Sequence, residues 1–78
     1  MNRDKTKHLE LYKILGKNIQ TLRKSKDLSQ EELAFRVGTA RNYLGCVERA
    51  EKFPSLAFIF DIKDALNCKI EDLFININ

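Results

Sequence analysis

The part of the chain that most constrains its fold is the segment 28–49, LSQEELAFRVGTARNYLGCVER. Ser29 and Glu32 form a capping box, in which each side chain accepts a hydrogen bond from the backbone N–H of the other residue. Apolar residues follow at helical spacing up to Val37, and Gly38 can adopt the left-handed conformation that ends a helix. The pattern therefore predicts a short helix that begins at Ser29 and ends in a tight turn at Gly38.

A second helix is predicted from about Arg41 to Arg49, because Leu44 and Val47 mark one inward face. The opposite face carries Arg41, Asn42, Gly45, Cys46 and Arg49. A polar, partly basic helix face that a short helix holds outward suits the major groove of DNA. An ordinary solvated helical hairpin has the same local pattern, so the rest of the chain must discriminate between the two.

The length of 78 residues predicts a single domain, 1–78, with residues 1–7 as a flexible polar tail. A core of this size contributes only about 3 to 5 kcal/mol, so association between chains is expected. Neither Cys46 nor Cys68 lies in a CxxC pair or a zinc spacing, which argues against a disulfide, a metal site and a cofactor. His8 is the sole histidine and no nucleophile–base or paired-carboxylate arrangement is evident, so we do not expect an enzyme.

Charge and hydropathy restrict the partners. No secretory segment and no apolar run of roughly 18 residues is present, which predicts a soluble, cytoplasmic protein with no membrane partner. Residues 1–40 contain nine Lys or Arg and five Asp or Glu, a net charge of +4, whereas residues 41–78 contain five and six, a net charge of −1. Basic charge concentrated on one part of a small domain suggests an anionic partner.

Apolar periodicity predicts a helix on each side of the central pair. From His8 to about Ser25 one buried stripe recurs at helical spacing, formed by Leu11, Leu15, Ile19 and Leu22. Gly16 interrupts this helix, which predicts either a bend or a later helix start. After Pro54, Ser55 is the expected N-cap of another helix, whose inward stripe is formed by Leu56, Ile59, Ile62 and Leu66.

The chain is expected to finish with a short helix. Asn67 can close the preceding helix, and a last helix is predicted over about Ile70 to Ile75. Residues 74–78 alternate weakly, so a strand there that pairs between two chains is a further possibility. The expected fold is a compact all-α bundle of five helices.

Junction residues in this order carry a family resemblance over about Leu15 to Phe74. They are Leu22-Arg23, Leu28-Ser29-Gln30-Glu31-Glu32-Leu33-Ala34, Gly38, Val47-Glu48-Arg49, Pro54-Ser55, Ala65-Leu66 and Leu73. With these residues the chain resembles the phage repressor and Cro-like (XRE-type) helix-turn-helix family. The resemblance implies a lambda-repressor-like DNA-binding domain with its helix-turn-helix at helices 2 and 3.

The resemblance also implies roles for single residues. Arg41 and Asn42 would meet base edges, because arginine can bond guanine O6 and N7 together and asparagine can bond adenine. Gly45 and Cys46, one turn later, would permit close approach or contact with a thymine methyl group. The phosphate contacts expected beside them are Gln30, Tyr43, Arg49 and Lys52.

The resemblance implies an ion pair between Arg23 and Glu48 that fixes the angle between two helices. Three positions depart from the family pattern. Ala40 lacks the usual capping side chain, Gly45 weakens the second helix, and Ala50 stands where glycine would make a left-handed turn. We therefore expect the second helix of the pair, the recognition helix that would enter the major groove, to be weakly stabilised. We hypothesise that it becomes fully ordered only when it binds DNA.

Leftover apolar residues predict a dimer. The candidate interface is Phe58, Phe60, Ile70, Phe74, Ile75 and Ile77. A role in the peripheral core is the alternative for these residues, above all for Phe58. Two-fold pairing would place two recognition helices about 34 Å apart, to match a palindromic operator in double-stranded DNA.

The length, and Arg41-Asn42-Tyr43 followed by Glu48-Arg49, most resemble the controller proteins of restriction-modification systems. These are homodimers that activate and repress their own operons, which makes operator DNA, a second copy of the chain and RNA polymerase the candidate partners. An antitoxin or short phage regulator, whose C-terminal apolar surface binds a protein partner, is the alternative. Sequence-neutral DNA packaging is disfavoured by the modest net charge and by Asn42.

Overall fold

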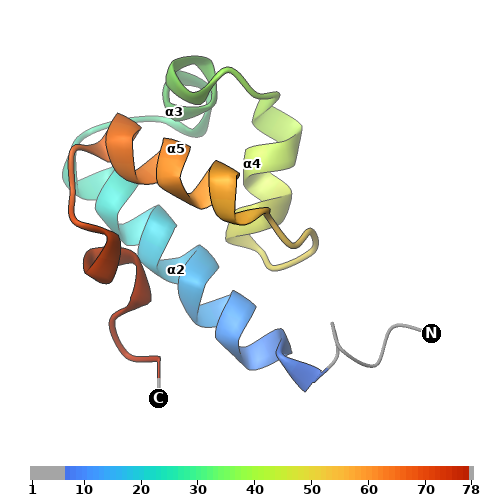
Figure 1. The fold of residues 1–78 in the computed structure, drawn as a ribbon. Helices are drawn as coiled ribbons and strands as arrows, with labels where there is room; N and C mark the ends of the chain where they lie inside the picture. The colour runs from blue at the N-terminus through green and yellow to red at the C-terminus, as the bar shows by residue number, and fades with distance from the viewer. Residues whose placement is uncertain (1–6, 78) are drawn as a thin grey trace.

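The computed structural model describes residues 7–77 of the chain (Figure 1). These residues contain four α-helices and one 3-10 helix, joined by short loops. The elements are α2 (Leu9–Ser25), α3 (Gln30–Val37), α4 (Arg41–Glu48), α5 (Leu56–Leu66) and the 3-10 helix η1 (Ile70–Phe74). An all-α fold is thus confirmed, and residues 7–77 contain no strand. The prediction of five α-helices is wrong, because the last segment is too short for a stable ladder of α-helical hydrogen bonds and forms the tighter 3-10 turn.

Two expectations concern the ends of the chain. The predicted tail 1–7 lies outside the described residues except for Lys7, and the alternating pattern 74–78 ends at Asn78, which also lies outside them. The described part of that pattern, 74–77, has no strand, and Phe74 belongs to the 3-10 helix, so pairing of this segment between chains has no support in the fold.

Helix ends lie where local side chains can satisfy the terminal backbone groups. The Ser29 hydroxyl accepts from the Glu32 N–H at 3.0 Å, and the Glu32 carboxylate accepts from the Ser29 N–H at 2.8 Å. The hydrogen bond from the Ser29 backbone, followed by one from the Ser29 side chain, lowers the pKa of the Glu32 carboxyl group. Gly38 ends α3 with φ 81°, Ser55 caps α5, and Asn67 ends α5 with φ 53°. The capping box and the three other boundary residues are therefore confirmed.

Gly16 lies within an unbroken α2, so neither the predicted bend nor the later start occurs. A Cβ at this position would lie 2.5 Å from the carbonyl oxygen of Glu48 and 2.6 Å from that of Val47. Glycine is present because the backbone of α2 touches the C-terminal end of α4. A contact between helices distant in sequence thus explains a residue that looked like a helix interruption.

The core is formed by one set of buried apolar side chains. Its members are Leu15, Ile19, Leu28, Leu33, Ala34, Leu44, Val47, Ile59, Ile62, Leu66 and Leu73. The prediction that Leu56 faces inward is wrong, since Leu56 is 68% exposed. Leu56 is the first residue of α5 and lies at the edge of an apolar groove beside Leu11 and Tyr12, rather than beneath another helix.

Asn18 holds the C-terminal segment against α2. Its carboxamide nitrogen donates to the backbone carbonyls of Leu73 at 2.9 Å and Ile75 at 2.8 Å. The residue is buried, and its two bonds satisfy carbonyls that a short 3-10 helix leaves free. The sequence pattern gave no role to Asn18.

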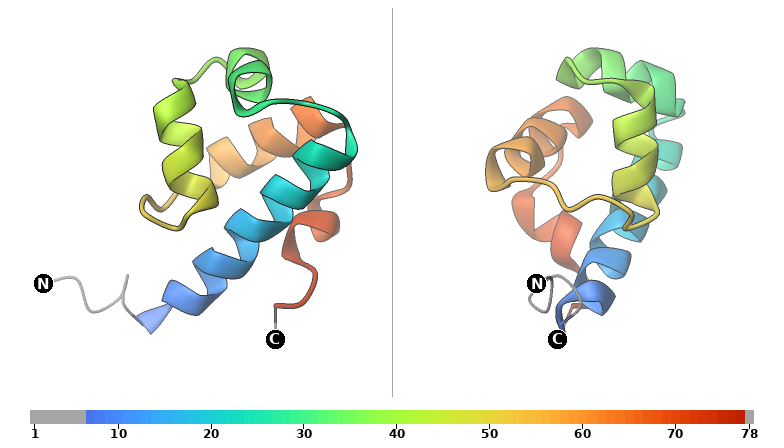
Figure 2. Two further views of the ribbon diagram at one scale, coloured as in Figure 1. Left: turned by 180° about the vertical axis from the view of Figure 1, so that it is seen from behind. Right: turned by 90° about the vertical axis from the view of Figure 1, so that its right-hand side faces the viewer.

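The helices are arranged around α2, which contacts α4, α5 and η1. α3 and α4 meet at one corner of the molecule, and α5 crosses close to α3 (Figure 1). Figure 2 shows α4 and η1 on opposite sides of α2. This arrangement supports α4 from behind and leaves its other face open.

Candidate nucleic-acid interface

The ion pair expected between Arg23 and Glu48 is present and buried. Arg23 Nε donates to Glu48 Oε2 at 2.7 Å, and Nη2 donates to Oε1 at 3.1 Å. The side chains are 7% and 1% exposed. Arg23 Nη1 also donates to the carbonyl of Leu28 at 2.8 Å, just before α3. One guanidinium therefore links α2, the end of α4 and the segment that leads into α3.

Gln30 joins this network, which the sequence did not predict. Its Nε2 donates to Glu48 Oε1 at 2.9 Å, so the carboxylate accepts from both α2 and α3. Among the described residues, no buried side-chain nitrogen or oxygen lacks a hydrogen-bond partner. A buried network with every member satisfied fixes geometry, and here it sets α3 and α4 at a defined angle.

The N-terminal turn of α4 presents Arg41 and Asn42, both exposed. Ala40 has the extended backbone of an N-cap, with φ −75° and ψ 143°, but supplies no capping hydrogen bond. At the other end, Ala50 adopts φ 60° and is buried. Two of the three departures noted in the sequence, Ala40 and Ala50, therefore leave α4 uncapped at its start and followed by a left-handed alanine.

Gly45 is buried beneath two side chains. A Cβ there would lie 3.1 Å from Arg49 Nη1 and 3.5 Å from Gln30 Oε1. Cys46, beside it, is half-buried. Of the four expected base-contacting positions, Arg41 and Asn42 are thus open, Cys46 is partly covered, and Gly45 is reachable only if Arg49 or Gln30 moves.

Arg49 and Glu51 form an exposed ion pair at the C-terminal end of α4. Arg49 Nε donates to Glu51 Oε2 at 3.0 Å, Nη2 donates to Oε1 at 3.1 Å, and Nη2 also lies 3.8 Å from Cys46 Sγ. The hydrogen bonds to Glu51 raise the pKa of Arg49, and those from Arg49 lower the pKa of Glu51. Glu51 lies beyond the helix and follows no periodicity, which is why the sequence did not point to it.

Tyr43 and Lys52, the other expected phosphate contacts, lie on different parts of the surface. Tyr43 is half-buried and packs edge-on against Phe58, with ring centroids 5.2 Å apart. Lys52 is exposed in the loop after α4. Packing on Phe58 orients the tyrosine ring, while the lysine keeps its freedom to reach an anion.

The expected dimer residues do not all form exposed surface. Phe60 and Ile75 are 45% and 53% exposed, whereas the others are half-buried against the core: Phe58, Ile70, Phe74 and Ile77. Two exposed residues were missed, Leu56 and Phe35, the latter 86% exposed on α3. Leu56 borders an apolar groove of about 220 Å³ that Phe74 also lines. The exposed apolar surface is therefore built more from the start of α5 than the sequence suggested.

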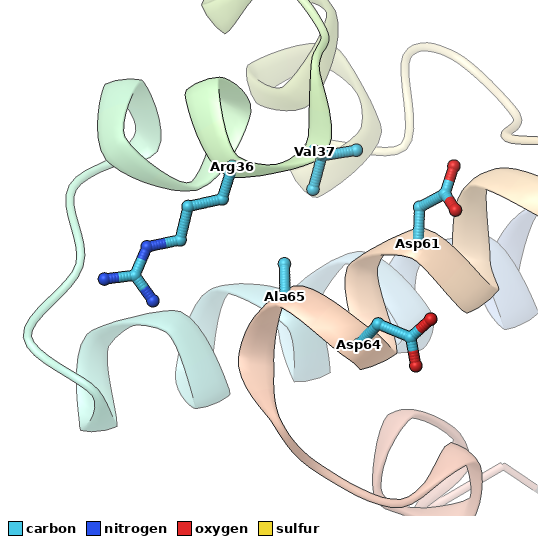
Figure 3. Close-up of a pocket in the computed structure, with 5 residues that line it drawn as sticks. All are labelled: Arg36, Val37, Asp61, Asp64 and Ala65. Carbon is cyan, nitrogen blue, oxygen red and sulfur yellow. The ribbon is translucent and has the colours of Figure 1, made fainter.

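A second hollow, of about 350 Å³, lies between α3 and α5 (Figure 3). Val37 and Ala65 face each other across it, with Arg36 on one side and Asp61 and Asp64 on the other. The charged side chains that line it, those of Arg36, Asp61 and Asp64, are all exposed to solvent. Within residues 7–77 there is no group of three or more His, Cys, Asp or Glu that could hold a metal ion, and no helix there is long and apolar enough to cross a membrane.

Comparison with known proteins agrees with this geometry. A family model described as helix-turn-helix matches residues 19–73. The control protein C.SmaI from Serratia marcescens is 35% identical over 65 residues, which cover 83% of this chain and 77% of that protein. An uncharacterized HTH-type transcriptional regulator, y4dJ from Sinorhizobium fredii, is 33% identical over 58 residues, 74% of this chain and 75% of the relative.

A solved structure gives the same result for the fold. The restriction-modification controller protein C.AhdI from Aeromonas hydrophila superposes with a TM-score of 0.79 at 40% identity, covering 81% of this chain and 96% of that one. The region that the family model matches, residues 19–73, contains α3, α4 and the network of Arg23, Gln30 and Glu48. The chain belongs to the XRE-type helix-turn-helix family.

Proposed function

We propose that this chain is a sequence-specific DNA-binding transcription regulator, a single domain that acts as a homodimer on a palindromic operator. The observation that carries the proposal is the buried network of Arg23, Gln30 and Glu48, which fixes α4 while Arg41 and Asn42 remain exposed at its start. Similarity to the controllers C.SmaI and C.AhdI supports a restriction-modification operon as the target. The protein would act by binding rather than by catalysis, and in the cytoplasm.

In this proposal α4 enters the major groove. Arg41 and Asn42 read base edges, and Cys46 supplies a small apolar contact one turn later. Gly45 has no side chain, so the ends of Arg49 and Gln30 can lie over it close to the helix. Phosphates are bound by Lys52, by the Tyr43 hydroxyl and by the second N–H of the Gln30 amide, whose first N–H is used by Glu48.

The dimer would be formed by apolar surface at the start of α5 and at the C-terminal segment. Leu56 and Phe60 are four residues apart, so they share one face of α5. Phe74 borders the groove beside Leu56, and Ile75 follows it in the chain. Phe58, Ile70 and Ile77 are half-buried against the core and would be the less exposed members of the interface. An exposed apolar patch on so small a domain favours an interface.

The experiment is selection of bound duplexes from genomic DNA, followed by salt titration of binding to the recovered site. A steep negative slope of log affinity against log salt is expected. Arg41→Ala should flatten the preference at one base pair, at a cost of about 1 to 3 kcal/mol, whereas Lys52→Ala should weaken all duplexes alike and reduce the slope by about 1. Equal binding of recovered and random duplexes at physiological salt would refute operator recognition.

A second candidate is an antitoxin or short phage regulator whose apolar surface binds another protein. The exposure of Phe35 favours this candidate, because this side chain has no role in reading DNA or in the proposed dimer. Gene neighbourhood discriminates: an adjacent restriction endonuclease or methyltransferase supports the controller, and an adjacent toxin supports the alternative. If the dimer activates its operon, RNA polymerase is a further partner, which transcription with purified components would test.

A further inference from the structure

We infer that Glu51 is a positioning residue for sequence recognition, because its carboxylate orients the Arg49 guanidinium across Gly45, where Arg49 reads a base edge instead of neutralising a phosphate. This inference rests on the proposed function, since it assumes that α4 enters the major groove. It assigns to Arg49 a role different from the phosphate contact expected from the sequence.

The hydrogen bonds between Arg49 and Glu51 leave one end of the guanidinium group free. Arg49 uses Nε and Nη2 for the two Glu51 oxygens, at 3.0 and 3.1 Å. A guanidinium has five N–H donors in a fixed plane, so this side-on pair leaves the end formed by Nη1 and Nη2 with free donors. Two parallel donors are what guanine O6 and N7 accept, and the contact of Nη2 with Cys46 Sγ, at 3.8 Å, is weak enough to be replaced.

Placement on the helix gives the second argument. Arg49 Nη1 lies over Gly45, 3.1 Å from the position that a Cβ on residue 45 would occupy. Gly45 and Cys46 lie three and four residues after Asn42, and Arg49, the C-cap, lies four and three residues after them, so all four share one face of α4. The guanidinium therefore lies on the face that begins with Asn42, and glycine at position 45 provides the space for it.

Charge gives the third argument. Each protein cation that neutralises a phosphate adds about 0.9 to the salt slope, and a cation already paired with a carboxylate contributes far less. Pairing raises the pKa of Arg49 and lowers that of Glu51, so both groups stay charged through the neutral range. A neutral, oriented pair is suited to discriminating bases rather than to attracting the DNA backbone.

The test compares Glu51→Gln with the wild-type protein on two probes: the duplex that wild type enriches most from a random 20-bp library, and a scrambled duplex of the same composition. Fluorescence anisotropy at several salt concentrations gives the affinity ratio and the salt slope. Glu51→Gln should lower the ratio of selected to scrambled affinity by about tenfold, because a freed Arg49 no longer holds its fork toward the base. Scrambled DNA should bind more tightly, with a slope steeper by about 1.

Matched variants separate this role from simple charge removal. Glu71→Gln makes the same charge change on η1, which lies across α2 from α4, and should leave the ratio unchanged. Arg49→Lys keeps the charge without the planar fork, so it should lower the ratio by itself, and adding Glu51→Gln to it should cost nothing more.

Two outcomes would overturn the inference while leaving the proposed function intact. In the first, Glu51→Gln strengthens binding to both duplexes equally, which would make Glu51 only a repulsive surface charge. In the second, the ratio is unchanged. A wild-type protein that enriches no sequence from the library would instead overturn the proposed function, whatever the variants do.

Discussion

Gly16 of α2 lies directly against the peptide carbonyl of Glu48, the last residue of α4. The carboxylate of the same glutamate is bound by Arg23, two turns further along α2. The end of α4 is thus fixed to α2 both through its backbone and through its side chain. Since α4 carries the proposed DNA-reading face, substitutions at these contacts test how that face is held.

Gly16→Ala should lower the free energy of unfolding by about 2 to 3 kcal/mol. The new methyl group would lie 2.5 Å from a backbone oxygen that cannot rotate away, so α2 and α4 must separate. Urea unfolding followed by circular dichroism measures the change. Lys17→Ala, at the adjacent exposed position, is the control and should stay within about 0.5 kcal/mol of wild type. Equal stability of the two variants would contradict the close contact.

Removing one member of the buried ion pair should cost about 3 to 5 kcal/mol. Arg23→Met leaves the Glu48 carboxylate with only the Gln30 amide, and Glu48→Met leaves a buried guanidinium without its anion. The double variant should be less destabilised than either single one, because no uncompensated charge remains. Chemical denaturation of all three measures this coupling. An unchanged unfolding midpoint in both single variants would show that the ion pair does not contribute to the stability of the fold.

Asn18→Ala should detach the C-terminal segment from α2. It removes hydrogen bonds to two carbonyls, those of Leu73 and Ile75, and should destabilise the fold by about 2 kcal/mol. Amide hydrogen exchange gives a local readout: relative to the wild-type protein, exchange should accelerate more in η1 than in α3. If the dimer forms as proposed, its dissociation constant should also rise. Uniformly faster exchange in every helix would show that the loss is global.

Ala40→Ser should stabilise the protein by about 1 kcal/mol and raise its melting temperature by about 4 to 8 °C. The backbone of Ala40 already has N-cap geometry, close to that of Ser29, and lacks only the oxygen that accepts a hydrogen bond. Ala57→Ser, at an exposed position in the first turn of α5, adds the same hydroxyl to a helix that Ser55 already caps and should not stabilise. Thermal melts of both variants decide the matter.

Gly45→Ala should separate stability from binding. Alanine in a helix is favoured over glycine by about 1 kcal/mol, and its methyl group meets only the movable ends of Arg49 and Gln30, so the melting temperature should rise. Binding to the selected duplex should weaken, because the Arg49 guanidinium loses its place on the helix face. A variant that is less stable than wild type would show that those side chains cannot move aside.

The sequence by itself determined the helix boundaries and most of the core. Ser29 with Glu32, Gly38, Ser55 and Asn67 act through hydrogen bonds and backbone conformation within one turn, so their effects do not depend on distant residues. The ion pair between Arg23 and Glu48 was predicted from the family resemblance. The absence of a capping side chain at Ala40 was also visible in the sequence.

Tertiary structure decided the features that join separate segments. Glycine at position 16 is explained by the contact of α2 with α4, which the sequence pattern does not reveal. The hydrogen bond of Asn18 likewise depends on η1 lying beside α2. Leu56 fits an inward stripe by spacing, but no helix covers the first residue of α5. Likewise, the choice of Glu51 as partner for Arg49 depends on how the chain turns through the left-handed Ala50. Periodicity reports which face of a helix is apolar, whereas these contacts depend on which other element packs there, and only the assembled fold fixes that.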